Sequence, residues 1–214
     1  DDPAFVRFVD YFETAHASGS EAFLVMAFLP GMPGSSLRDA IQRSAGCGLD
    51  FQSVLRAFVR YAHGLKTIHD RGIYHRDIKP TNLYYPEDRP DSASIMDLGI
   101  ARDESGTETT GQVPGTLDYM PPETALGGTR GDAGMDIYAL GLCLYEALSG
   151  KKGFPRLPTG SQGFAQFFQR ARDKARPVFD DECVTSRPEL LDLLLRMTDP
   201  DPRKRISSAA ELER

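Results

Sequence analysis

"GIYHRDIKPTNLYY", residues 72–85, places His75, Arg76, Asp77 and Lys79 between two apolar flanks. A solvent-exposed loop would spread such charges along the chain, and a buried strand would exclude them. The pattern therefore indicates a rigid polar loop that apolar neighbours hold from both sides. Many active sites are built in this way.

The composition is typical of a globular chain with a net negative charge. Its 214 residues suffice for one large domain or two modest ones, and 40% hydrophobic with 26% charged residues favour a sizeable core. The net charge is −6 and no basic stripe runs along the chain, which argues against nucleic acid as the main partner.

The cysteines and the longest apolar stretch indicate where the chain resides. The three cysteines, Cys47, Cys143 and Cys183, lie far apart without a C-x-x-C spacing, so we expect neither structural disulfides nor a zinc site, and a reducing cytoplasm fits best. The longest apolar stretch, residues 22–29, is too short to span a bilayer, and we expect no membrane contact from this segment. The chain opens on Asp1, and we expect it to be a piece of a longer protein.

Hydrophobic periodicity predicts a hairpin followed mostly by helices. Aromatic and β-branched runs at 5–12 and 22–29 predict two strands, with the polar stretch 13–21 as a long loop. Three- and four-residue apolar steps after Asp50 predict a long amphipathic helix that Asp50 caps and that ends before Gly72. The other expected elements are a helix from Ser36 to Ile41, a strand at 94–96, a loop at 101–122, a buried helix at 135–150, and helices near 163–175, 188–199 and 207–214.

Five motifs follow one another in a fixed order. These are "HRDIKPTN" at 75–82, "DLG" at 97–99, "GTLDYMPPE" at 115–123, "DIYALG" at 136–141 and "DPDPRKR" at 199–205. In this order they resemble the landmarks of eukaryotic-type (Hanks-type) Ser/Thr protein kinases, whose catalytic loop follows the H-R-D-x-x-x-x-N frame.

The resemblance implies an α+β, protein-kinase-like fold. Residues 1–29 would be the N-lobe remnant, a β-hairpin with the start of the hinge, and residues 30–214 a mainly α-helical C-lobe. Within the C-lobe, 75–82 would be the catalytic loop and 97–123 the activation segment.

The resemblance also assigns roles in phosphoryl transfer from ATP with Mg²⁺. Asp77 would accept or orient the proton of the substrate hydroxyl, and Lys79 would contact the transferred phosphate. Asn82 and Asp97 offer the hard oxygen ligands that suit magnesium. The residues expected to bind the nucleotide are Met26, Ala27, Leu29, Tyr84 and Asp97.

Supporting roles follow from the same resemblance. His75 would brace the catalytic loop without transferring a proton. Asp136 would cap its helix, hold the backbone of the catalytic loop, or both. Glu123 and Arg205 would form a buried ion pair, although two surface charges are the simpler interpretation. Cys143 is most simply a small core residue.

The chain departs from the family pattern in its first part and at one pocket residue. No G-x-G-x-x-G loop, strand lysine or helix glutamate of the family precedes residue 29, so we expect residues 1–214 alone to be inactive. The hairpin would then lack its usual sheet, and we expect self-association through it. Tyr84 stands where the family has an aliphatic residue beneath the adenine, and could narrow the pocket or stack on the base.

The function implied is ATP-dependent phosphorylation of Ser or Thr in proteins, carried out by the parent protein of which this chain is the C-lobe. Phosphorylation of the activation segment, with Thr109 or Thr110 as the expected site and Arg76 as its partner, would regulate it.

A pseudokinase or docking scaffold is one alternative. The intact Asp77, Asn82 and Asp97 argue against it, and the missing N-lobe elements and Tyr84 argue for it. A small-molecule phosphotransferase is another. The segment "GTLDYMPPE" and Lys79 argue against it, because in the family that the chain resembles these features serve a peptide substrate.

Overall fold

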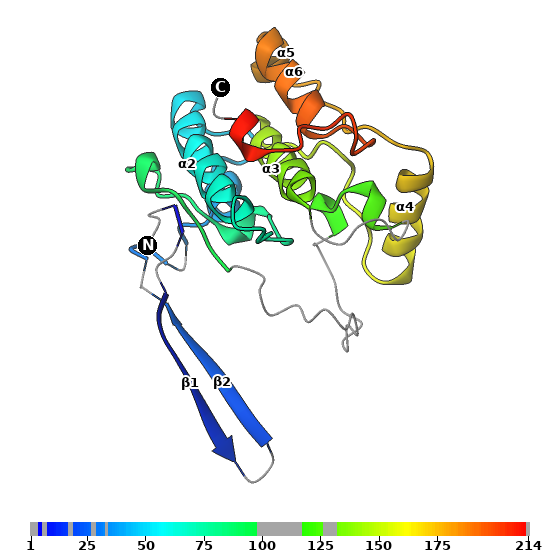
Figure 1. Ribbon diagram of the computed structural model, residues 1–214. Helices are drawn as coiled ribbons and strands as arrows, with labels where there is room; N and C mark the ends of the chain where they lie inside the picture. Colours follow the sequence, from blue (N-terminus) through cyan, green and yellow to red (C-terminus); the bar gives the residue numbers. More distant parts are fainter. Residues whose placement is uncertain are drawn as a thin grey trace.

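The helical part of the chain forms one body, from which a two-stranded hairpin projects (Figure 1). The computed structural model describes residues 4–5, 8–16, 19–26, 29–32, 34–97, 117–125 and 132–212. The strands are β1 (Phe8–His16), β2 (Gly19–Met26), β3 (Leu83–Tyr84) and β4 (Ser94–Ile95). The helices are α1 (Leu37–Arg43), α2 (Phe51–His69), α3 (Ala133–Ser149), α4 (Ser161–Arg172), α5 (Glu182–Thr185) and α6 (Pro188–Met197). Single 3₁₀ turns are η1 (Pro80–Asn82), η2 (Pro90–Ser92), η3 (Leu117–Tyr119), η4 (Pro122–Thr124) and η5 (Ala209–Glu211).

The predicted hairpin is confirmed, but the prediction of a long loop between its strands is wrong. β1 and β2 pair in antiparallel register from Phe8 opposite Met26 to His16 opposite Gly19, so the polar stretch 13–21 belongs largely to the strands. Backbone pairing continues through polar residues because it needs only the peptide groups. The expected self-association through this hairpin stays a prediction.

The predicted N-caps of the first two helices are confirmed. The Ser36 hydroxyl accepts a hydrogen bond from the backbone N–H of Asp39, and the Asp39 carboxylate accepts one from the backbone N–H of Ser36, which completes a capping box at α1. Asp50 accepts from the backbone N–H of Ser53 at 2.9 Å and begins α2. Each cap satisfies N–H groups that the first helical turn leaves without a partner.

α3 is the centre of the helical body. It is buried nearly all round, as its apolar sequence predicts, and it packs against both α2 and α6. The approach to α6 is close, since a Cβ built at Gly141 would lie 2.9 Å from Thr198 and 3.0 Å from Met197. α3 ends at Gly150, whose φ of +71° is a left-handed conformation that favours glycine.

The last part of the chain differs from its sequence pattern in two places. α5 was not expected, and the expected helix at 207–214 is only the turn η5 within the described residues. α4 and α6 occupy the regions predicted for them. Most of the predicted loop at 101–122 lies outside the described residues. Its described end, 117–122, contains η3 and the first residue of η4.

Across the part of the chain that the structure describes, no helix is both long and apolar enough to cross a bilayer. The expected cytoplasmic location stays a prediction.

Candidate active site

The loop at 75–82 is held against α3 by one buried carboxylate. Asp136 accepts hydrogen bonds from the backbone N–H groups of His75 and Arg76, both at 2.8 Å. The ring of His69 lies on the same carboxylate, with Nε2 2.9 Å from Oδ2. A carboxylate can only accept, so His69 donates from Nε2. Asp136 therefore holds the loop backbone, while the cap of α3 is Asp132 and not Asp136.

His75 connects the loop to the chain that leaves β4. Its Nε2 donates to the carbonyl oxygen of Met96 at 2.9 Å, and its Nδ1 accepts from the backbone N–H of Asp77 at 3.3 Å. This pattern fixes the neutral Nε2–H tautomer. The backbone N–H of Met96 in turn donates to the carbonyl oxygen of Asn82 at 2.8 Å. Asp97, the next residue, is thereby held close to Asn82.

The three residues predicted to be catalytic lie together. Lys79 donates from Nζ to Asp77 Oδ2 at 2.7 Å, and Asn82 donates from Nδ2 to the same oxygen at 3.1 Å. Asn82 also donates to the backbone carbonyl oxygen of Asp77 at 2.9 Å. The Asp77 carboxylate is therefore fixed in one orientation at the surface of the loop, where its side chain is mostly but not fully buried.

Two residues of this site have left-handed backbones although they are not glycine. Arg76 has φ +64° and Asp97 has φ +51°. Such conformations cost free energy and occur often at functional sites. The hydrogen bonds to Asp136 on one side and to Asn82 on the other hold the chain in them.

Asn82 and Asp97 can supply oxygens to a magnesium ion. Because Asn82 donates from Nδ2 to Asp77, its Oδ1 is turned away from that carboxylate. This oxygen accepts from the Thr81 hydroxyl at 3.4 Å and has a second lone pair for a ligand. The carboxylate of Asp97 is exposed. The described residues contain no group of three or more His, Cys, Asp or Glu side chains that could hold a metal. Two protein oxygens nevertheless fit magnesium, which keeps several waters and takes further ligands from phosphates.

The predicted nucleotide residues are placed only in part. Met26 ends β2, Leu29 is half-buried, and Ala27 lies outside the described residues. Tyr84 is buried, and its hydroxyl donates to the carbonyl oxygen of Pro30 at 2.8 Å. The ring is thus fixed to the segment that follows the expected hinge.

Glu123 and Arg205 form the expected buried pair. The guanidinium donates from both terminal nitrogens to the two carboxylate oxygens, at 2.6 and 2.9 Å. The side chain of Arg205 is 0% exposed and that of Glu123 is 14% exposed. Arg205 also donates to the carbonyl oxygens of Asp199 and Gly134, and it lies 4.8 Å from the ring centroid of Tyr138.

Comparison with known families gives this arrangement its context. The protein kinase domain model matches residues 1–214. The chain belongs to the protein kinase domain family. The kinase domain is 35% identical over 219 residues to the serine/threonine-protein kinase pkn2 of Myxococcus xanthus. It is 33% identical over 208 residues to drp72 of Corynebacterium efficiens and 31% identical over 214 residues to PknB of Mycolicibacterium smegmatis, both named serine/threonine-protein kinases.

These alignments cover 96–98% of the kinase domain but only 24–37% of the relatives' own lengths. The predicted family and the α+β kinase fold are confirmed. The geometry is compatible with the catalytic roles of Asp77, Lys79 and Asn82, which stay predictions. His69 was not predicted to belong to the site, and its only signal is its position in the last turn of α2, ahead of the charged loop.

Proposed function

We propose that the protein transfers the γ-phosphate of ATP to a Ser or Thr hydroxyl of a protein substrate. The observation that carries this proposal is the fixed Asp77 carboxylate, which Lys79 and Asn82 hold on a loop bound to α3. The family of the chain and the names of its relatives favour a protein over a small molecule as the acceptor.

In the proposed reaction, the hydroxyl oxygen of the substrate forms a bond to the γ-phosphorus. The bond between that phosphorus and the oxygen bridging it to the β-phosphate breaks, and ADP leaves. The hydroxyl proton passes to Asp77. Lys79, whose Nζ lies 2.7 Å from Asp77 Oδ2, would contact the transferred phosphoryl group and balance its charge.

Asn82 and Asp97 would hold the magnesium ion through the side-chain oxygens described above. When bound, magnesium supplies charge neutralisation of the phosphates and keeps the reacting atoms in line. The contribution of this chain is to keep both ligands beside Asp77 through the hydrogen bond between Met96 and Asn82.

The direct test is transfer of labelled γ-phosphate from ATP, with Mg²⁺, to generic protein and peptide substrates by the full-length protein. We expect phosphate on Ser or Thr. Asp97→Asn should abolish transfer because it removes a ligand charge. Nucleotide binding without transfer would instead support the docking scaffold, and transfer only to small alcohols would support a small-molecule phosphotransferase.

We further predict that phosphorylation of the activation segment raises activity. The expected sites, Thr109 and Thr110, lie outside the described residues. Their expected partner, Arg76, is exposed and precedes Asp77 in the chain. Its guanidinium can bind a phosphate through two hydrogen bonds. Phosphatase treatment of the full-length protein should lower its activity, and the double change Thr109→Ala with Thr110→Ala should reproduce this loss. If neither treatment changes the rate, Arg76 has only a structural role.

A further inference from the structure

The turn η3, which lies near the end of the expected activation segment, 97–123, is bound into the domain through Tyr119. The Tyr119 hydroxyl donates to Glu146 Oε2 of α3 at 2.5 Å, and both side chains are buried. Burial and the neighbouring Glu146 carboxylate raise the pKa of Tyr119 well above its usual value, so the phenol keeps its proton and donates. Arg38 of α1 lies 3.5 Å from the same hydroxyl.

The preceding residue, Asp118, has a second set of partners. Its Oδ1 accepts from the backbone N–H of Leu157 at 3.1 Å, and its Oδ2 accepts from Lys152 Nζ at 2.6 Å. The side chain of Asp118 is 7% exposed and that of Lys152 is 22% exposed. The same ammonium lies 4.9 Å from the ring centroid of Tyr119, within cation–π range. Lys152 therefore contacts two successive residues of η3.

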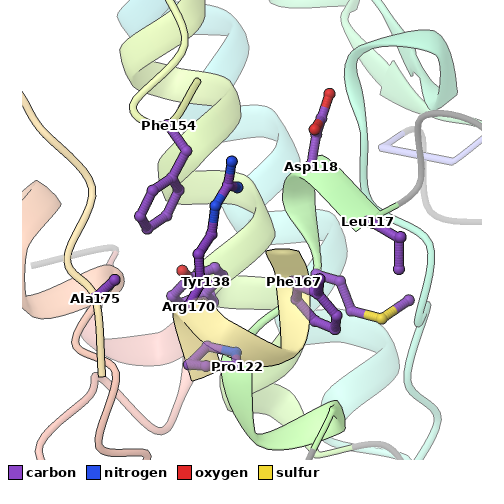
Figure 2. A pocket seen from close by; sticks show the side chains of 9 residues that line it. Leu117, Asp118, Pro122, Tyr138, Phe154, Phe167, Arg170 and Ala175 are labelled. Carbon is purple, nitrogen blue, oxygen red and sulfur yellow. The ribbon is translucent and has the colours of Figure 1, made fainter. Parts of the chain in front are cut away.

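The turn forms one wall of a small pocket. Figure 2 shows Leu117 and Asp118 at one side of this pocket and Phe154 with Arg170 at the other. Arg170 lies over the Phe154 ring and donates to the carbonyl oxygen of Pro155, so its charge already has partners. The cation in direct contact with Asp118 is Lys152.

We infer that Lys152 is a positioning and specificity-determining residue, which fixes η3 for substrate binding and neutralises Asp118. This inference rests on the proposed function, because η3 lies within the segment "GTLDYMPPE", residues 115–123, that the protein substrate would meet. Without the ammonium, Asp118 becomes an uncompensated carboxylate at the pocket edge. A buried carboxylate without a partner attracts a cation. The substrate would then supply it, as a Lys or Arg near its acceptor hydroxyl.

The first experiment compares Lys152→Met with wild type in the full-length protein. The two substrate peptides are identical except at one position near the acceptor hydroxyl, where one carries Arg and the other Gln. We expect the ratio of kcat/KM for the Arg peptide to that for the Gln peptide to rise about tenfold. The KM for ATP should stay unchanged. Lys152→Arg should restore the wild-type ratio, and adding Asp118→Asn to Lys152→Met should remove the new preference.

The matched control is Lys151→Met. Lys151 is the neighbouring lysine, 58% exposed, and it pairs with Asp181 at 2.9 Å instead of Asp118. The variant Lys151→Met should leave the kcat/KM ratio of the two peptides unchanged. A ratio within twofold of wild type for Lys152→Met, or an equal loss for both peptides, overturns the specificity role.

A second readout does not depend on phosphoryl transfer. The amide of Leu157 donates to Asp118, so its hydrogen-exchange rate reports whether that carboxylate stays in place. We expect Lys152→Met to speed exchange at Leu157 and Tyr119 at least tenfold, with the interior of α2 unchanged. Unchanged exchange at Leu157 overturns the positioning role. If wild type transfers no phosphate to any substrate, the proposed function fails, and exchange still decides whether Lys152 holds η3.

Discussion

Asp77→Asn should lower the rate of phosphoryl transfer by about 100- to 10,000-fold, the usual contribution of a general base. The amide has the same shape as the carboxylate but cannot take up the hydroxyl proton. It also loses the charge that holds Lys79 at 2.7 Å. The full-length protein should be assayed by transfer of labelled γ-phosphate, with nucleotide binding measured in parallel.

Nucleotide binding should survive this change, because Asp97 and the segment near Tyr84 are untouched. Asp88→Asn is the matched control, since Asp88 is an exposed aspartate that contacts only the neighbouring Arg89 in the described ion pairs. It should leave the rate unchanged. Near-full activity of Asp77→Asn would mean that another group accepts the proton, and our assignment would be wrong.

Arg205→Met should lower the free energy of unfolding by about 3–5 kcal/mol, the typical cost of removing one partner of a buried ion pair. The guanidinium is fully buried, and it satisfies the Glu123 carboxylate and two backbone carbonyl oxygens. Its loss leaves these acceptors without a donor. For a domain of this size, the expected fall in melting temperature is roughly 6–20 °C. Arg205→Lys should restore little of the lost stability, because an ammonium cannot form the bidentate pair with Glu123.

Arg203→Met provides the control for this stability prediction. Arg203 carries the same side chain two residues earlier, but its pair with Asp201 at 3.1 Å is 86% exposed on the arginine side. Exposed pairs contribute little because water and salt screen them. Its melting curve should overlay that of wild type. Equal shifts for both variants would show that the pair with Glu123 is not the source of the effect.

The sequence predicted those features that local pattern encodes. The apolar steps after Asp50 gave α2 with its cap, because burial of one face repeats with the helical period. The site at Asp77, Lys79 and Asn82 was predictable because these residues lie within one short loop. Residue spacing alone did not indicate that this loop rests on Asp136, and only the resemblance implied it.

The features that were missed depend on contacts between distant segments. Lys152 and Asp118 are 34 positions apart, and neither carries a motif that points to the other. Asp132, not Asp136, caps α3, since several carboxylates near a helix start are equivalent until the backbone is placed. Both hairpin strands continue closer to the turn than predicted, because pairing of peptide groups leaves no mark on the side-chain pattern.

The hydrogen bonds from His75 and Arg76 to Asp136 connect the loop at 75–82 to the hydrophobic interior. Asp136 belongs to the most buried helix of the body, so opening the loop backbone breaks both hydrogen bonds and leaves a buried carboxylate without these two donors. Local fluctuations of the loop are thereby disfavoured. Damage to the packing of α3 should therefore reduce the number of competent molecules, while each molecule that remains folded keeps its full turnover.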